Sequence, residues 1–378
     1  MPESFDIVIV GGGISGVSLA ARLAPHARVC LLEGEAHLAT HATGRSAALF
    51  VESYGPPAIR RLTTMSRAFF ETPPQDFSEA PLSRPRSGLV FGREEQRDRL
   101  EEDFALAQKT AEVTWLEADD LAKRAPLLRP GIAAAGFIEP AARDIDTDAL
   151  LQGFSREARR HGAKIVTSAP LVRAESQGAG WRLEAGAQAI ACRHLVNASG
   201  AWADRIAAVA GVAPKGLQPK RRTAATIGVP DEIAPLLARH PFATPVDESF
   251  YFKPETGAIM VSLSEETPSE PCDAYPEDID VATALERFHE ATVVPRARPL
   301  ATWAGLRTFA PDRLPVVGFD ADAPGFFWYA GQGGYGIQTS PAHSALAAKA
   351  ILGEALSPAE AEILRAFRPD RFDAALRA

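Results

Sequence analysis

The turn at residues 11–16 constrains the fold more than any other part of this sequence. It reads Gly-Gly-Gly-Ile-Ser-Gly and follows the apolar run Phe5–Val10, which is typical of a parallel strand covered on both faces. Small and apolar residues then recur at helical spacing over Ile14–Leu23, and a second buried run follows at Arg28–Leu32. A strand, a glycine turn, a helix and a strand in this order predict a right-handed crossover in a doubly wound α/β sheet.

The three spaced glycines of this turn fit the fingerprint of a dinucleotide-binding loop. Gly11 allows the tight turn, Gly13 lets the backbone approach a pyrophosphate, and Gly16 lets the helix pack closely on the strand. Glu33 ends the second strand about 20 residues later, where an acid accepts a hydrogen bond from the adenosine ribose. An ordinary tight turn is the alternative, but a lone glycine pattern would lack the strand, the helix and the acid.

Length, charge and cysteine content set the scale of the fold and exclude some functions. The chain has 378 residues, of which 46% are hydrophobic, enough for a large core shared by two domains. Its net charge of −8 argues against non-specific nucleic-acid binding, which needs a basic surface. No apolar run approaches the roughly 18 residues of a membrane span, and the first run is too short for a signal peptide. The 3 cysteines are widely spaced and form no disulfide framework, so we expect a cytoplasmic protein.

The region from 216 to 303 differs in character from the start of the chain. Residues 249–253 alternate and are joined to the apolar run 258–263 by Pro-Glu-Thr-Gly, which predicts a hairpin. Residues 223–229 are also strand-like, so we expect a second, mostly antiparallel sheet. Elsewhere the pattern predicts helices at 59–70, 147–161 (capped by Asp146) and 201–210, a helical stretch at 94–125, and strands at 164–166, 194–198, 314–318 and 326–330.

A second glycine-rich turn near the end of the chain indicates which dinucleotide binds. Residues 331–336 contain four glycines and run into a helix-forming stretch, so a second helix N-terminus is available to a ligand. A nicotinamide enzyme usually completes its nucleotide domain without interruption. Here the second strand runs instead into small residues around Arg45, at 41–48. Such a stretch suits contacts to a second phosphate and an aromatic ring, as in flavin proteins.

Seven longer motifs span nearly the whole chain. They are THATGRSAA (40–48), DIDTDAL (144–150), LVNASGAWADRIAAVAG (195–211), GLQPKRR (216–222), DESFYFKP (247–254), TWAGLRTF (302–309) and GFFWYAGQGGYGIQTS (325–340). Together they resemble the FAD-dependent D-amino-acid dehydrogenase and oxidase family, within the glycine and sarcosine oxidase group, and are most similar to the D-arginine dehydrogenases. The resemblance implies a Rossmann-like FAD-binding domain built from 1–47, 144–215 and 304–378. It also implies a substrate-binding domain with a mostly antiparallel sheet, built from 48–143 and 216–303.

The same resemblance implies which residues contact a non-covalently bound FAD. Besides the first turn and Glu33, the expected contacts are Ile14, Ser15, Gly34, Ala42, Thr43, Gly44, Arg45, Ser46, Ala47, Ala48, Leu49, Val172, Ala198, Gly200, Gly333, Gly334, Tyr335, Gly336, Ile337 and Gln338. The last turn would direct backbone N–H groups and the positive end of its helix at the N1–C2 carbonyl edge of the flavin. Hydride transfer places negative charge there. A structural helix with a flexible entry is the alternative for this turn.

The resemblance also implies a substrate site for an α-amino acid. Arg307 is the expected carboxylate clamp because its planar fork matches a carboxylate bidentately. Tyr251 lies between two phenylalanines that face the opposite side of a strand, and it matches a tyrosine that supports the carboxylate. Tyr54 matches a tyrosine on a loop over the site, Arg222 a further substrate-side position, and Gln338 a contact to substrate or flavin. A surface arginine, core tyrosines and a solvated basic turn are the alternatives.

The implied reaction is oxidative deamination of a D-amino acid. The substrate binds with its amine neutral, hydride passes from Cα to flavin N5, and water hydrolyses the imino acid to a 2-oxo acid and ammonia. A quinone, a carrier or oxygen is the expected electron acceptor, and the protein is expected to be a monomer or homodimer. Oxidation of glycine, sarcosine or another secondary amine is one alternative. Others are a flavin-dependent 2-hydroxy-acid dehydrogenase and a degenerate nucleotide-binding protein without turnover.

Two departures from the family pattern bear on the substrate side chain. Members specific for basic D-amino acids have a carboxylate where this chain has Gly88, and a histidine where it has Leu49. A guanidinium buried without a counter-charge is costly. We therefore expect apolar or small D-amino acids to be preferred over D-arginine.

The sequence contains no convincing metal site. His37 and His41 are four residues apart, but no glutamate follows His37 and no third ligand is evident. Asp144, Asp146 and Asp148 imitate the start of a calcium loop, yet a helix begins too soon after them, so helix capping explains them better. We expect no metal.

Overall fold

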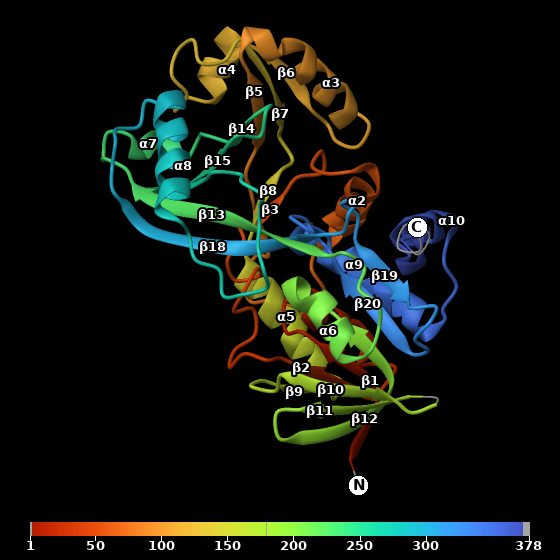
Figure 1. Ribbon diagram of the computed structural model, residues 1–378. Helices are drawn as coiled ribbons and strands as arrows, with labels where there is room; N and C mark the ends of the chain where they lie inside the picture. Colours follow the sequence, from red (N-terminus) through yellow and green to blue (C-terminus); the bar gives the residue numbers. More distant parts are fainter. Residues whose placement is uncertain (1, 179, 373–378) are drawn as a thin grey trace.

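The computed structural model describes residues 2–178 and 180–372, and its lower lobe in Figure 1 is built on the predicted parallel sheet. Strand β1 (Glu3–Val10) pairs in parallel with β2 (Val29–Leu32) and β12 (Gln188–Asn197); β2 pairs likewise with β9 (Lys164–Val166), and β12 with β20 (Phe326–Ala330). The antiparallel strands β10 (Leu171–Ser176), β11 (Trp181–Ala185) and β19 (Val316–Phe319) extend the sheet. Both faces of β1 are covered, since Ile7 and Ile9 belong to one buried cluster and Val8 and Val10 to another.

Three helices cover one face of this sheet and come from distant parts of the chain. Helix α1 (Ile14–Leu23) contacts both α5 (Thr147–Arg160) and α9 (Gly336–Leu352), and α9 also contacts α2 (Pro57–Glu71). Helix α6 (Ala203–Val209) contributes to the buried cluster on the other face. Helix α10 (Pro358–Phe367) contacts β19. Both glycine turns therefore lead into helices on the same side of the sheet.

The upper lobe is a nine-stranded sheet. Its strand order is β17 (Thr267–Pro268), β13 (Gln218–Gly228), β16 (Ala258–Ser262), β15 (Tyr251–Glu255), β14 (Phe242–Pro245), β5 (Gly88–Gly92), β7 (Ala135–Glu139) and β6 (Thr114–Glu117), with β18 (Pro299–Phe309) also paired to β13. Every pair except β5–β14 is antiparallel. Helices α3 (Arg97–Ala107), α4 (Ala118–Arg124), α7 (Ala234–Leu237) and α8 (Asp278–Ala291) surround it. A small sheet of β3 (Leu49–Phe50), β8 (Arg143–Ile145) and β4 (Ser83–Pro85) lies near the junction of the lobes.

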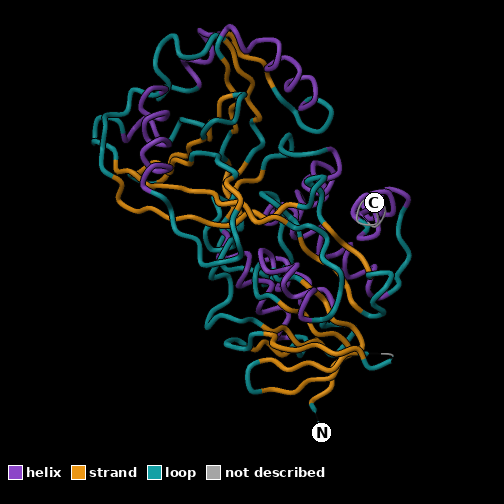
Figure 2. Tube along the Cα trace, viewed as in Figure 1, coloured by secondary structure: helices purple, strands orange, loops and turns teal. Residues whose placement is uncertain are grey.

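The long strands β13 and β18 run side by side toward the lower lobe (Figures 1 and 2). The predicted fold class, a Rossmann-like domain with a second, mostly antiparallel domain, is confirmed by this arrangement. The boundary expected at residue 304 falls inside β18, which pairs with β13 from Pro299 to Phe309. No helix in the described part of the chain is long and apolar enough to span a bilayer.

Most predicted elements are present, and the errors have physical causes. Helix α1 and the 251–262 hairpin agree with the prediction, and Asp146 caps α5 by accepting the Ala149 N–H at 2.9 Å. The helical stretch at 94–125 is wrong as a single element, because β6 separates α3 from α4. Only one residue of β6, Leu116, is buried, so its short pattern does not stand out from the charged residues around it.

Candidate active site

Both glycine turns line one cavity of about 450 Å³ at the carboxyl end of β1. Gly11–Ser15 form one part of its wall, and Gln332–Gly334 with Gly336 and Ile337 form another. Residues 33–35, 39–43, 45–47, 169–171 and 198–202 also line it. Two helix N-termini that lie far apart in sequence therefore open into the same space.

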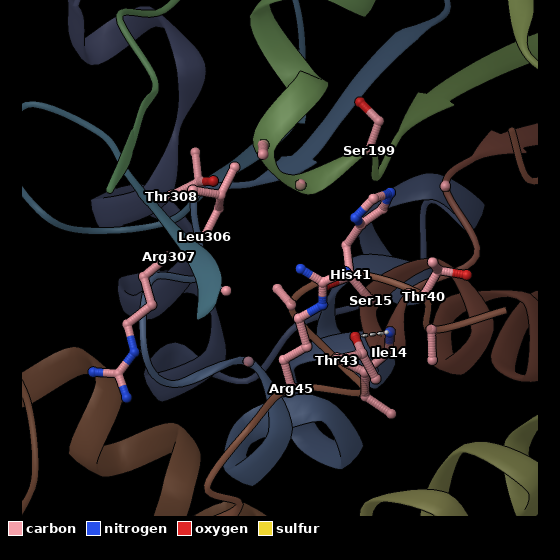
Figure 3. Close-up of a pocket in the computed structure, with 18 of the residues that line it drawn as sticks. Ile14, Ser15, Thr40, His41, Thr43, Arg45, Ser199, Leu306, Arg307 and Thr308 are labelled. Atoms are coloured by element: carbon pink, nitrogen blue, oxygen red, sulfur yellow. Dashed lines mark hydrogen bonds between the residues drawn. The ribbon is translucent and has the colours of Figure 1, made fainter. Parts of the chain in front are cut away.

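The glycines of the first turn are required by close backbone contacts. Gly11 has a φ of +114°, and a Cβ there would lie 2.4 Å from the Ala198 carbonyl oxygen. A Cβ on Gly16 would lie 1.9 Å from the Gly11 carbonyl oxygen, so this glycine lets α1 pack against the turn. Helix α1 has no acidic residue in its first turn, and the Ile14 N–H donates to Thr43 Oγ1 at 3.0 Å (Figure 3). The positive end of α1 is therefore available to an anion.

The Glu33 carboxylate lies in the wall of this cavity and also braces the first turn. Its Oε2 accepts the Gly12 N–H at 2.6 Å, and its Oε1 accepts the Glu35 N–H at 2.9 Å. Each carboxylate oxygen can accept a second hydrogen bond. The Glu33 carboxylate can therefore still accept a hydrogen bond from a ribose hydroxyl. That contact stays a prediction.

Arg45 has a role that the sequence did not indicate. Its Nη1 donates to the carbonyl oxygens of Ala274 at 2.8 Å and Ala304 at 2.9 Å, and its Nη2 is paired with Asp273. Arg45 also lines the cavity (Figure 3), but its donors tie the 41–48 stretch to β18 and to the segment before α8. The expected phosphate contact of Arg45 stays a prediction, and the joining role is an additional one.

The remaining residues expected to contact FAD form two groups, those in the wall of the larger cavity and those outside it. Gly13, Ser15, Gly34, Ala42, Thr43, Ser46, Ala47, Ala198, Gly200, Gly333, Gly334, Gly336 and Ile337 line the cavity, whereas the described wall does not include Gly16, Gly44, Val172 or Tyr335. Val172 is 60% exposed, and its neighbours Pro170 and Leu171 are in the wall instead. Pro170 and Leu171 were not predicted from the sequence, because the residue types in this segment do not indicate which of them face the cavity.

A second cavity, of about 210 Å³, shares part of its wall with the first. The shared residues are Ser46, Ala47, Arg222, Tyr251, Arg307, Gly334 and Ile337. Three of the five residues expected at the substrate site, Arg307, Tyr251 and Arg222, therefore lie at the junction of the two spaces. The expected FAD contacts Ala48 and Leu49 line the second cavity.

The junction concentrates positive charge in a buried place. The Arg307 Nη2 donates to Tyr251 Oη at 3.4 Å, and the Arg222 Nε donates to the Glu265 carbonyl oxygen at 2.9 Å. Burial and the nearby Arg307 lower the pKa of Arg222. Burial raises the pKa of Tyr251, but the two guanidinium groups outweigh it and leave that pKa below its ordinary value. The Glu266 carboxylate lies 3.9 Å from Arg222 Nη2. Among the described residues no carboxylate forms an ion pair with Arg307, so an anionic ligand would satisfy this group.

Tyr54 and Gln338 line the second cavity in different ways. Tyr54 is 36% exposed, and its ring centroid lies 5.1 Å from that of Tyr335. The Gln338 Oε1 accepts the Val51 N–H at 3.2 Å, and its Nε2 donates to Thr63 Oγ1 at 2.9 Å. Gln338 thus already has partners in the protein, and its expected contact to substrate or flavin stays a prediction.

The far part of the second cavity contains residues that sequence reasoning did not select. Val90, Phe137, Phe242 and Val246 form apolar walls, and Arg60, Asp103 and Glu248 add charge. Burial raises the pKa of Asp103. These residues come from β5, β7, β14 and the loop after it, α2 and α3, and only the folded chain brings them together. The described residues contain no cluster of His, Cys, Asp and Glu that could hold a metal ion.

Comparison with known proteins identifies the family. Residues 6–350 match the family described as DAO, FAD dependent oxidoreductase, and the chain belongs to this family. Glycine oxidase of Bacillus licheniformis is 25% identical over 390 aligned residues, which cover 100% of both chains. The fold is similar to that of L-proline dehydrogenase from P. horikoshii, with a TM-score of 0.86, 20% identity and 99% of each chain covered. It is also similar to that of the L-alpha-glycerophosphate oxidase of Mycoplasma pneumoniae with FAD bound, with a TM-score of 0.82, 16% identity, and 93% and 95% of the chains covered.

The cofactor is therefore FAD, and the larger cavity suits it. The cavity extends from the first glycine turn and Glu33 to the second glycine turn and Arg307. It presents the N-termini of α1 and α9, neither of which has an acid in its first turn. Such ends suit the pyrophosphate and the electron-rich edge of a flavin. The residues that would hold the two ends of FAD are thus those of the two turns.

Proposed function

We propose that this FAD-dependent oxidoreductase oxidatively deaminates D-amino acids to 2-oxo acids and ammonia, and that it favours apolar or small side chains over D-arginine. The observation that carries the proposal is the position of Arg307, Tyr251 and Arg222 at the junction of the cofactor cavity and the smaller cavity. A carboxylate bound there would neutralise buried positive charge, and the rest of the substrate would extend into the smaller cavity.

The residues of the junction would bind and orient the substrate. Arg307 offers a planar fork to the carboxylate, and the Tyr251 hydroxyl, 3.4 Å from Arg307 Nη2, can donate to the same group. Arg222 adds a second positive charge, and it is held by the Glu265 carbonyl oxygen. FAD, when bound, accepts the hydride that leaves the substrate α-carbon. An amino acid with a side chain has one α-hydrogen. With the carboxylate fixed at the junction and the side chain in the smaller cavity, only one enantiomer directs that hydrogen at the cofactor cavity.

The junction contains no side chain suited to take a proton from an ammonium group. The residues shared by the two cavities include no histidine, aspartate or glutamate among those described. A substrate with a neutral amine needs no such base. We therefore expect kcat/KM to rise with pH as the substrate amine deprotonates, and a flat profile across the alkaline range would contradict this part of the proposal.

The preference for apolar or small side chains rests on the walls of the smaller cavity. Leu49, Val90 and Phe242 are apolar wall residues. Gly88 begins β5 and has no side chain, so this position brings no carboxylate to the smaller cavity, whose described wall does not include it. One observation favours a second candidate: Asp103 lines the same cavity and could pair with a long cationic side chain. Similarity to glycine oxidase keeps glycine and N-methylglycine as further candidates.

A substrate panel tests the proposal. The purified protein with FAD would be assayed with an artificial electron acceptor against apolar, small and basic D- and L-amino acids, glycine, sarcosine and 2-hydroxy acids. The expected result is turnover of apolar and small D-amino acids, with ammonia and the 2-oxo acid as products. Turnover of 2-hydroxy acids alone, or of sarcosine alone, would refute the proposed substrate class. A preference for D-lysine or D-arginine would favour the candidate based on Asp103.

A further inference from the structure

The loop that carries Tyr54 is held almost entirely by side chains from other elements. It comprises residues 51–55, between β3 and α2, and we refer to it as the Tyr54 loop. Tyr54 faces the smaller cavity, and its hydroxyl lies 3.4 Å from where a Cβ on Gly334 would be. The same Cβ position on Gly334 would lie 3.1 Å from Arg307 Nη1. The placement of this loop therefore sets how closely the Tyr54 hydroxyl approaches the carboxylate anchor.

Glu139 accepts three of the hydrogen bonds that hold this loop. It ends β7 and is 2% exposed. Its Oε1 accepts the Glu52 N–H at 2.8 Å, while its Oε2 accepts the Ser53 N–H at 3.1 Å and the Ser53 hydroxyl at 2.5 Å. One carboxylate thus binds two consecutive amides and a hydroxyl directly before Tyr54. Hydrogen bonds to an ionised acceptor are stronger than those between neutral groups.

Further contacts hold the two ends of the loop. The Arg60 Nε donates to the Gly55 carbonyl oxygen at 2.6 Å, and Gln338 accepts the Val51 N–H at 3.2 Å. Within the loop, the buried Glu52 carboxylate is paired with Arg67 of α2. Arg60 and Gln338 line the smaller cavity, whereas Glu139 is not part of its described wall. Glu139 therefore acts on a ligand indirectly, through the loop and through its charge interaction with Arg60.

We propose that Glu139 is a positioning residue, which fixes the Tyr54 loop over the substrate cavity and so sets the affinity for the substrate. The proposal rests on the proposed function in one respect, namely that the ligand near Tyr54 is the substrate. The clamp links β7 of the upper sheet to a loop that covers residues from the second glycine turn. Loss of the clamp would free the loop without removing any group that contacts substrate or FAD.

The test compares Glu139→Gln with a matched control, Asp204→Asn. A glutamine keeps the size of the side chain but replaces one accepting oxygen by an NH₂ group, which cannot accept from a backbone N–H, so at least one of the backbone hydrogen bonds of the clamp is lost. Asp204 is a suitable control because its carboxylate also accepts two backbone N–H groups, those of Lys215 and Leu217 at 3.1 and 2.8 Å. It lies outside the described walls of both cavities.

Hydrogen–deuterium exchange of the loop peptide gives a readout that needs no substrate. We expect the amides of Glu52 and Ser53 to exchange faster in Glu139→Gln and to be unchanged in Asp204→Asn. Unchanged exchange in Glu139→Gln would overturn the proposal, whatever the substrate of the enzyme proves to be. Failure of the proposed function would appear separately, as an absence of turnover in the wild-type protein.

Kinetics test the link to Tyr54. With a substrate that the wild type oxidises, we expect KM to rise roughly 10- to 100-fold in Glu139→Gln, with FAD content retained. In combination with Tyr54→Phe, the double variant should lose little more than the worse single variant, whereas independent effects would multiply. If Glu139→Gln does not fold, Ser53→Ala removes one donor and should raise KM in the same direction. Multiplying effects, or an unchanged KM in either variant, would refute the proposal.

Discussion

Replacing Arg307 by lysine tests whether a planar fork, rather than positive charge alone, holds the substrate carboxylate. Lysine keeps the charge at the junction of the two cavities but can make only one directed bond to a carboxylate in place of two parallel bonds. Each charge-assisted hydrogen bond contributes about 1.5–3 kcal/mol. We therefore expect kcat/KM for the best D-amino acid to fall about 10- to 150-fold.

The specific signature of this prediction is its dependence on the substrate carboxylate. The assay compares kcat/KM for a D-amino acid and for its carboxamide, which has the same side chain but no negative charge. Arg307→Lys should reduce the rate for the acid far more than the rate for the amide. Arg296→Lys is the matched control, because Arg296 makes two parallel hydrogen bonds to Glu286, at 2.6 and 2.8 Å, on the surface and outside both cavities, and it should change neither rate. An equal loss for acid and amide in Arg307→Lys would refute the reasoning.

Three further changes test other parts of the structure. Gly16→Ala places a Cβ 1.9 Å from the Gly11 carbonyl oxygen, so FAD binding to the apoprotein, measured by fluorescence titration, should weaken about 5- to 150-fold. Gly228→Ala is the control, because its Cβ would lie 3.5 Å from its nearest neighbour and outside the described walls of both cavities, and it should bind FAD normally. Tyr251→Phe removes one hydroxyl from the anchor and should lower kcat/KM about 5- to 15-fold without changing FAD affinity; an unchanged kcat/KM would exclude this role. His343 is fully buried, and burial lowers its pKa to about 3, so the folded state binds fewer protons than the unfolded state and stability falls as the pH drops below the ordinary histidine pKa. Between pH 8 and pH 5, the free energy of unfolding of His343→Leu should therefore fall by about 2 kcal/mol less than that of the wild type. Denaturant titration at the two pH values measures this difference. Equal losses would show that His343 does not carry the effect.

The parts of the fold that the sequence predicts are those set by local pattern. The first turn, α1 and the hairpin of β15 and β16 were predictable because glycine positions, helical spacing and alternation are local properties. Tyr251 was assigned to the opposite face from Phe250 and Phe252 for the same reason, and those two phenylalanines are indeed in the core while Tyr251 lines both cavities.

The contacts that could not be predicted depend on the packing of distant elements. The partners of Arg45 lie 229 and 259 residues away in the sequence, so its role in joining segments has no local signature. In the sequence, Glu139 stands at the end of an apolar strand. Its hydrogen bonds to the Tyr54 loop join residues that are 86 and 87 positions apart. Asp103 belongs to a charged amphipathic helix, where an acid is expected on the solvent side. Only the packing of elements that are distant in sequence brings Arg45 and Asp103 to the two cavities and Glu139 to the Tyr54 loop.

Anaerobic mixing of the FAD-loaded protein with pairs of D- and L-amino acids tests the central claim most directly. If Arg307 holds the carboxylate at the junction of the two cavities and presents one α-hydrogen to the cofactor, apolar D-amino acids should bleach the flavin absorbance rapidly and their L-enantiomers should not. Bleaching by the L-enantiomers alone would contradict the proposed stereochemistry. Bleaching by neither member of any pair, with FAD firmly bound, would contradict the account of this junction as an amino-acid site.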